Sequence, residues 1–144
     1  MKNEKKLVAV YGSLRQGMHN HYTLGKSEYI GTFNSEPVFT MFNVNDRYPA
    51  VINEGSTSII MEVFEADEDI QKKLDQLEGY SEDFDKEDNY YNKETIETPY
   101  GEAFIYLFNY DSSNLEKIEC GDWCSWMKMQ ETKNNVKIYN EWEY

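Results

Sequence analysis

Residues 7–17, LVAVYGSLRQG, constrain the fold of this chain more than any other stretch, because a short apolar run breaks abruptly into a polar loop with glycine. A short run of branched apolar residues bounded by turn residues predicts a buried β-strand. Gly12 lacks a Cβ, which suits a sharp turn or the close approach of a ligand, and the Ser13 hydroxyl can hydrogen-bond. We therefore predict a strand that leads directly into a site loop.

The chemistry of this loop favours an anionic ligand. Successive backbone N–H groups at the end of a strand form an anion-binding concavity, and a following helix N-terminus would add its positive dipole end. The loop lacks the GxxxxGK[ST] and GxGxxG spacings, so it does not support a nucleotide site. A carboxylate would fit. The alternative interpretation of Gly12 and Ser13 is a simple turn after an edge strand.

The composition is that of a folded, acidic protein. The 144 residues, 40% of them hydrophobic, suffice for one core, so we predict a single domain over residues 1–144. The formal net charge of −13 argues against a nucleic-acid partner, which requires clustered Lys and Arg. Two interpretations of this charge remain, a solvated acidic surface and a module that binds a basic protein.

The sequence predicts no metal, cofactor or membrane anchor. Cys120 and Cys124 lack the C-x-x-C spacing of zinc and redox sites, and the two histidines, His19 and His21, lie far from them in the chain. The first residues hold no apolar signal core, and no run approaches the roughly 20 apolar residues of a membrane span. We expect a cytoplasmic protein, and its oligomeric state stays open.

Short strands dominate most of the chain. Apolar patterns bounded by turn residues predict strands at residues 29–34, 37–44, 48–52 and 58–65, with a turn at residues 53–55. A hairpin is predicted from residues 91–98 and 102–110, joined through Pro99, Tyr100 and Gly101. Residues 81–89 read as an exposed acidic loop, either a lid or a solvated surface, and residues 130–144 as a final strand or a loosely held tail.

Residues 67–77 are the clearest predicted helix, with Asp67 as N-cap and Gly79 just past the end. Glu78 would lie at the negative pole of the helix dipole, beside an apolar stripe. If it turns inward, both effects raise its pKa and make it a proton shuttle near neutrality; a solvated last-turn glutamate is the alternative. Glu62 is a secondary candidate carboxylate, for which an outward-facing strand position is the preferred interpretation.

Several motifs occur in one order over residues 7–126. They are YGSLRQG (11–17), YPAV (48–51), SIIMEVFEAD (58–67), LDQLEGY (74–80), GEAFIYLF (101–108) and GDW (121–123). In this order and spacing the chain resembles the gamma-glutamylcyclotransferase-like family, also called AIG2-like or gamma-glutamylamine cyclotransferase. The resemblance implies an α+β fold, a small mixed β-barrel-like sheet with a few helices, with its core over residues 7–126.

The same resemblance implies that a γ-glutamyl group cyclises to 5-oxoproline and releases an amine or amino acid, without a cofactor. Glu78 matches the family's glutamate and would be the general acid and base. The loop residues would offer N–H groups to the substrate carboxylate or to the oxyanion, and a tyrosine hydroxyl would lie near the site. The implied substrate-binding residues are Tyr11, Gly12, Ser13, Leu14, Tyr91 and Tyr106; for Tyr91 and Tyr106, packing in the core is the alternative interpretation.

Two other classes of function compete with this one. One is a non-catalytic module of the same fold that holds a small metabolite, against which a buried carboxylate at Glu78 argues. The other is the acidic protein-interaction module. Lys93 stands where relatives tend to have arginine; it keeps the charge but loses the bidentate fork, which bears on the distal end of the substrate. The leaving group stays open among an amino acid, a lysine side chain, a polyamine and another small amine.

Overall fold

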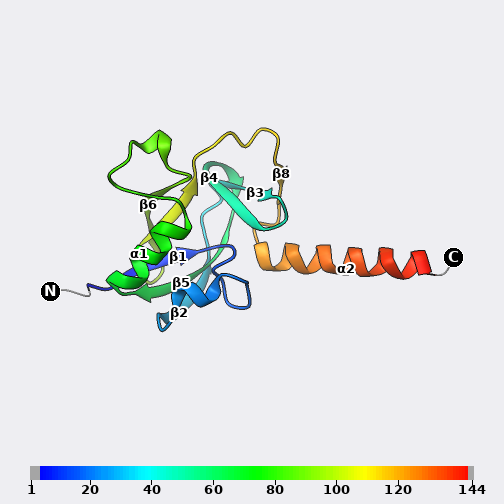
Figure 1. The fold of residues 1–144 in the computed structure, drawn as a ribbon, viewed down its shortest axis with the longest axis horizontal. Coiled ribbons are helices and arrows are strands. Elements are labelled where there is room, and N and C mark those ends of the chain that lie inside the picture. The colour runs from blue at the N-terminus through cyan, green and yellow to red at the C-terminus, as the bar shows by residue number, and fades with distance from the viewer. Residues whose placement is uncertain (1–3, 143–144) are drawn as a thin grey trace.

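The computed structural model describes the backbone of residues 4–142 and the side chains of residues 4–133. Within this part of the chain, two β-sheets are accompanied by two α-helices and two short 3-10 helices (Figure 1). The strands are β1 (Lys6–Val10), β2 (Glu28–Asn34), β3 (Phe39–Val44), β4 (Tyr48–Thr57), β5 (Ile60–Ala66), β6 (Tyr91–Thr98), β7 (Gly101–Phe108) and β8 (Glu116–Lys117). The helices are η1 (His21–Leu24), α1 (Glu68–Leu77), η2 (Lys86–Asp88) and α2 (Trp123–Trp142).

The larger sheet has five strands in the order β2-β5-β1-β7-β6. It is mixed, because β1 runs parallel to β7 and antiparallel to β5. The central position of β1 explains its continuous apolar run, since a strand covered on both faces has no solvent-facing side. Val8 and Val10 belong to one hydrophobic cluster with Leu74 of α1, whereas Ala9 belongs to a second cluster that the other sheet covers. The α+β fold with a small mixed sheet is as predicted.

The smaller sheet has three strands in the order β4-β3-β8. Its hairpin, β3 to β4, pairs Val44 with Tyr48 and turns through residues 45–47. Asn45 and Asp46 in this turn have positive φ (54° and 60°), a conformation that Asn and Asp adopt more readily than most other residues. Met41 and Val51 of this sheet pack with Met61 and Ile105 of the larger sheet in one buried cluster. The main core therefore lies between the two sheets.

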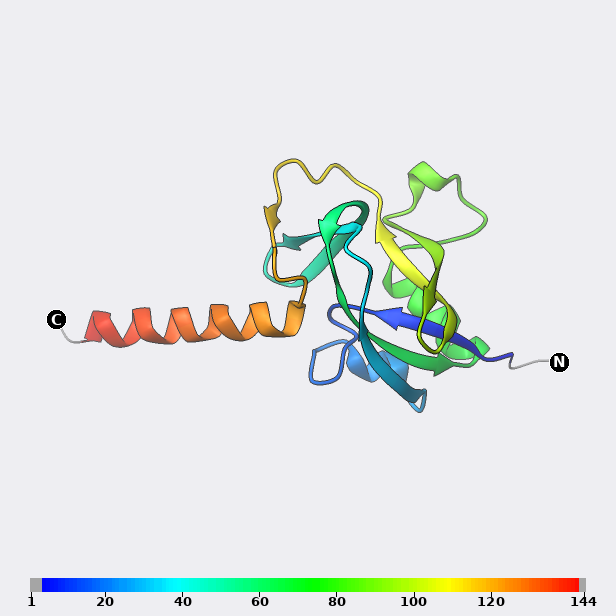
Figure 2. The same ribbon diagram turned by 180° about the vertical axis from the view of Figure 1, so that it is seen from behind.

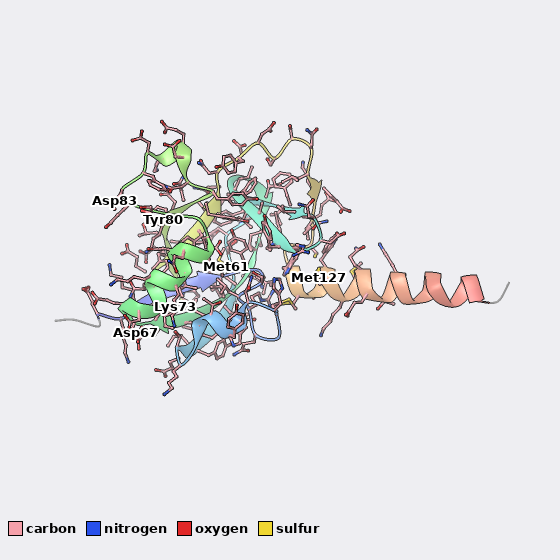
Figure 3. All side chains as sticks on the ribbon, viewed as in Figure 1. Met61, Asp67, Lys73, Tyr80, Asp83 and Met127 are labelled. Atoms are coloured by element: carbon pink, nitrogen blue, oxygen red, sulfur yellow. The ribbon has the colours of Figure 1, made fainter. Side chains whose placement is uncertain are left out.

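Helix α1 follows the predicted pattern at both ends. The Asp67 carboxylate accepts a hydrogen bond from the backbone N–H of Ile70 (2.9 Å), and Glu78 is the C-cap residue. Gly79 follows with φ of 64°, a conformation that glycine adopts without steric cost. Figure 3 shows Asp67 at the start of this helix and Tyr80 just beyond its end. Glu78 is thereby held where the chain leaves the helix.

Two strand predictions need correction. The turn predicted at residues 53–55 lies within β4, which continues to Thr57; the pairing of β3 with β4 jumps from Thr57 to Ile52 there, so these residues form a bulge. Glu62 is not outward-facing: its side chain is buried and paired with Arg15. Residues 53–55 are of types common in turns, but here they form a bulge within a strand. Glu62 was expected to be exposed, but here it is buried in an ion pair.

The prediction of a final strand at residues 130–144 is wrong as far as residue 142, because α2 continues through Trp142; residues 143 and 144 lie outside the described part. Trp123 and Trp126 at the start of α2 are buried and stacked, with ring centroids 5.4 Å apart. Beyond them the helix extends away from the sheets, as both ribbon views show (Figures 1 and 2). Among the residues described, no helix combines the length and apolar character needed to cross a membrane.

Candidate active site

A cavity of about 490 Å³ opens between the end of α1 and the two sheets, a size within the range of small-molecule sites. The seven residues that the family resemblance implied for the site all lie in its wall: Tyr11, Gly12, Ser13, Leu14, Glu78, Tyr91 and Tyr106. The wall also contains Arg47 from the turn before β4, Tyr48 and Pro49 from the start of β4, and Tyr90 from the loop before β6. The predicted residues, distant in sequence, are therefore gathered around one space.

Glu78 contributes a carboxyl group that has no charge partner. Burial raises the pKa of Glu78 from 4.5 to about 7, and no other influence on it is resolved. Within residues 4–133, no hydrogen bond or salt bridge to this side chain is formed. A glutamate in this setting exchanges a proton close to neutral pH, which is the property required of a general acid and base.

Tyrosines surround this carboxyl group. Burial is the main cause that raises the pKa of Tyr11, Tyr91 and Tyr106 well above that of a free tyrosine, and the charge of Glu78 acts on all three in the same direction. Burial and the same charge raise the pKa of Tyr48 to about 12. All four phenols stay protonated at neutral pH, so Glu78 is the group in this ring that titrates there.

The phenol protons of this ring are directed at fixed acceptors. Tyr11 donates to the carbonyl oxygen of Tyr106 (2.5 Å), and Tyr91 donates to the carbonyl oxygen of Pro49 (2.9 Å). Tyr106 donates to Asp75 Oδ1 (2.6 Å), a carboxylate that also pairs with Lys93 Nζ (3.0 Å). In this structure these phenols therefore form part of the cavity wall. Each phenol oxygen retains a lone pair that can accept a hydrogen bond from a ligand.

The loop after β1 is a tight turn in which the N–H of Arg15 donates to the carbonyl oxygen of Gly12 (2.9 Å). In such a turn the N–H groups of the two central residues point away from the turn's own bond. Those residues are Ser13 and Leu14, and no hydrogen bond within the described residues uses either N–H. Their carbonyl oxygens accept from Asn20 N–H and bond with His21 Nδ1. The loop is thus held rigid with two adjacent N–H donors available beside the cavity.

Gly12 has a packing role in addition to its place in the tight turn and in the cavity wall. A Cβ at this position would collide with the ring of Pro49 from the neighbouring sheet. The close approach is therefore made by another part of the chain, and it brings β4 against the loop. Glycine is required here for packing between the sheets.

Arg15 anchors the far side of the same loop. Its Nε bonds Glu62 Oε2 (2.9 Å), and its Nη1 bonds Asp122 Oδ1 (2.8 Å) just before α2. The other oxygen of Glu62 accepts from the backbone N–H of Gln16 (2.9 Å). Glu62 lies outside the cavity wall and holds the loop in place, so the secondary candidate carboxylate has a structural position.

Lys93 also has a structural position. Its Nζ pairs with Asp75 and lies 4.4 Å from the centre of the Phe104 ring, and the residue is not part of the cavity wall. Sequence reasoning missed Asp75, Arg47, Tyr48 and Tyr90. Asp75 and Tyr48 lie in motifs that were recognised, LDQLEGY and YPAV, whereas nothing in the sequence distinguished Arg47 or Tyr90 from other exposed residues.

Known proteins match the chain over the same region. The family described as "Gamma-glutamyl cyclotransferase, AIG2-like" matches residues 8–125. A Vibrio cholerae protein named "Putative gamma-glutamylcyclotransferase" is 36% identical over 118 residues, which cover 82% of this chain and 95% of that protein. Relatives from other bacteria carry related names; the Escherichia coli K12 protein YtfP, named as a gamma-glutamylcyclotransferase family protein, is 28% identical over 116 residues, 81% of this chain and 94% of its own length.

Comparison with solved structures agrees with these sequence matches. The crystal structure of YkqA from Bacillus subtilis aligns with a TM-score of 0.68 and 32% identity, over 91% of this chain and 44% of that one. The Pyrococcus horikoshii protein PH0828 aligns with a TM-score of 0.71 and 20% identity, over 88% of this chain and 97% of that one, a likeness of fold. The sequence match and the fold lead to the same conclusion: this chain belongs to the AIG2-like gamma-glutamyl cyclotransferase family.

Proposed function

We propose that this protein cyclises the γ-glutamyl group of a small substrate to 5-oxoproline and releases the attached amine or amino acid. The observation that carries the proposal is the Glu78 carboxyl group, which lies unpaired in the cavity with a pKa raised to about 7. The reaction needs one group that accepts a proton and then returns it, and Glu78 has the pKa for both steps at neutral pH.

The substrate supplies its own nucleophile in this reaction. Glu78 takes a proton from the α-ammonium group, and the amine nitrogen attacks the γ-carbonyl carbon to close a five-membered ring. The tetrahedral intermediate collapses as Glu78 returns the proton to the leaving nitrogen and the amide C–N bond breaks. The ring nitrogen gives up its second proton through Glu78 to the released amine, so that 5-oxoproline with a neutral lactam and an ammonium ion result. No water or cofactor is consumed. Enclosure in the cavity supports the folded substrate conformation that ring closure requires.

The loop after β1 supplies the complementary charge stabilisation. The N–H groups of Ser13 and Leu14 are adjacent, rigidly held and next to the cavity. They can bind the α-carboxylate of the glutamyl group or the oxyanion that develops on the γ-carbonyl oxygen. Either role favours a γ-glutamyl substrate over a cationic one at this end of the cavity.

The unpaired acid also argues against a module that only holds a metabolite. A protein that binds an anionic glutamyl group gains no affinity from a buried carboxyl group, which repels the ligand when it is ionised. A catalyst gains a proton shuttle from the same group. The acidic interaction module has only the net charge in its support, and that charge does not explain the cavity.

Replacing Glu78 by Gln tests the proposal, because Gln preserves the shape and removes the titrating group. We expect 5-oxoproline release from γ-glutamyl substrates, measured by mass spectrometry, to fall by about 10² to 10⁴ in Glu78→Gln. Glu82→Gln is the matched control, since Glu82 is exposed and lies outside the cavity wall. Turnover near that of the wild type in Glu78→Gln would refute the assignment, and loss of folding would show that Glu78 is structural.

A further inference from the structure

The cavity has one enclosed side and one open side. The loop residues Tyr11 to Leu14 are all buried, whereas Leu77 and Tyr90 on the same wall are 41% and 37% exposed. The glutamyl group is the part that every substrate shares, and it has to be folded for ring closure, so it suits the enclosed side. The group that leaves then lies towards the open side, where its identity can vary and its exit is short.

Arg47 lies on the open side of this cavity. It is exposed, and it is the one Lys or Arg among the described residues that line the wall. The charge of Arg47 lowers the pKa of Tyr48, whereas the charge of Glu78 raises it, so the Tyr48 phenol lies within reach of both groups. Arg47 therefore faces the same space as the proposed proton shuttle.

The backbone holds Arg47 in a defined place. It is the last residue of the turn between β3 and β4, and its N–H donates to the carbonyl oxygen of Val44 (3.1 Å). The neighbouring Asp46 is engaged elsewhere, since its carboxylate accepts from Asn43 Nδ2 (2.8 Å) and its N–H donates to Asn43 Oδ1 (2.9 Å). The acid beside Arg47 is thus occupied within the turn.

The guanidinium of Arg47 has no salt bridge to any side chain in residues 4–133. This is notable in a protein with 27 acidic and 14 basic residues, whose other arginine near the site, Arg15, binds two carboxylates. An arginine left without a carboxylate at the mouth of a cavity presents a planar fork of donors that matches a carboxylate ligand.

We propose that Arg47 recognises a carboxylate on the leaving group, so that the substrates are γ-glutamyl amino acids or peptides in preference to γ-glutamylamines. This inference rests on the proposed cyclotransferase function. The α-carboxylate of the glutamyl group is the competing ligand for Arg47, but the enclosed side already offers it the two N–H groups of the loop after β1. Binding of Arg47 to the leaving-group carboxylate and binding to the glutamyl α-carboxylate predict different results for two substrates that differ only in the leaving-group carboxylate.

Such a pair is γ-glutamyl-leucine and γ-glutamyl-3-methylbutylamine, in which the amine is leucine without its carboxylate. The wild type should favour the leucine compound in kcat/KM by about 10- to 100-fold, the amount expected for a hydrogen-bonded charge pair. Arg47→Gln should reduce this preference to near one, and Arg47→Lys should leave an intermediate preference because it keeps the charge without the fork. Lys117→Gln removes one exposed positive charge of the same sheet and should keep the wild-type preference.

The outcomes separate the two proposals. If Arg47→Gln lowers kcat/KM equally for both compounds, Arg47 acts on the glutamyl group or on the shape of the site, and the inference is wrong. A wild-type preference for the amine compound overturns it as well, while leaving the cyclotransferase function in place. If the wild type releases 5-oxoproline from neither compound, the proposed function fails, and the inference about Arg47 fails with it.

Discussion

Two glutamates of this protein, Glu62 and Glu78, have opposite surroundings. Glu62 is 5% exposed, and its two oxygens accept hydrogen bonds from Arg15 Nε and from the N–H of Gln16, both at 2.9 Å. Glu78 faces the cavity with neither a cation nor an N–H partner in residues 4–133. The first is at the crossing of β5 and the loop after β1, and the second is at the end of α1, so each position is defined by a rigid element.

The comparison shows what separates a carboxylate with a structural role from one that can act in proton transfer. A buried carboxylate that is paired with arginine contributes geometry, and the hydrogen bonds of Glu62 hold the loop after β1 in place. A carboxylate that is desolvated without a partner keeps its proton to higher pH, which costs stability and makes the proton available. Both glutamates serve the same cavity, one by holding its loop and the other by facing its interior.

Breaking the ion pair between Arg15 and Glu62 should have the larger effect on the free energy of unfolding. Arg15→Met leaves Glu62 buried without its cation, and removing one partner of a buried pair typically costs about 3 to 5 kcal/mol. Urea unfolding would measure this loss. The double variant Arg15→Met/Glu62→Met should lose much less than the sum of the two single variants, and additive losses would show that the pair is not coupled.

The role of the unpaired Glu78 can be tested through the pH dependence of stability. The pKa of Glu78 is about 7 in the folded protein and near 4.5 when unfolded, so between these values the folded state holds a proton that the unfolded state has lost. The contribution of Glu78 to the free energy of unfolding should therefore be largest below pH 4.5 and fall as the pH rises through 7.

The Glu78→Gln variant lacks this titration and serves as the reference. The wild type should lose on the order of 2 to 3 kcal/mol relative to Glu78→Gln between pH 4.5 and pH 8, measured by urea unfolding at several pH values. Parallel pH profiles of the two proteins would mean that Glu78 titrates normally, and the comparison with Glu62 would lose its basis.

The smallest expected effect concerns the tyrosines around Glu78. Tyr91→Phe removes the hydrogen bond to the carbonyl oxygen of Pro49 and should cost about 1 kcal/mol of stability. Because the Tyr91 proton is directed at Pro49, we expect kcat for 5-oxoproline formation to change by less than about 10-fold, well below the effect of Glu78→Gln. A fall in kcat comparable to that of Glu78→Gln would place the Tyr91 hydroxyl in the chemistry.

The sequence was informative wherever a local rule decided the structure. The run before Gly12 predicted β1, and Asp67 and Gly79 predicted both ends of α1, because caps and apolar runs act over a few residues. The same local rule placed Glu78 at the helix end. That all the candidate site residues would share one cavity followed only from the family resemblance, since nothing local brings residue 11 near residue 91.

The errors came from contacts between distant residues. A glutamate in a strand reads as exposed until Arg15, 47 positions earlier, is seen to pair with it. Residues 130–144 mix apolar and polar types without a clear period, so the pattern did not reveal that α2 continues through Trp142. In each case tertiary structure decided what the local pattern left open.

The cavity wall is shared between the two sheets, and this has a thermodynamic consequence. Tyr48 and Pro49 come from the smaller sheet, whereas Tyr91 and Tyr106 come from the larger one. A ligand that touches both sides ties the sheets together, so its binding energy adds directly to the cohesion of the whole domain. At a hundred times its dissociation constant such a ligand raises the unfolding free energy by about 2.7 kcal/mol. Binding of a ligand in the cavity can therefore be measured as a rise in the melting temperature, even in a variant that has no catalytic activity.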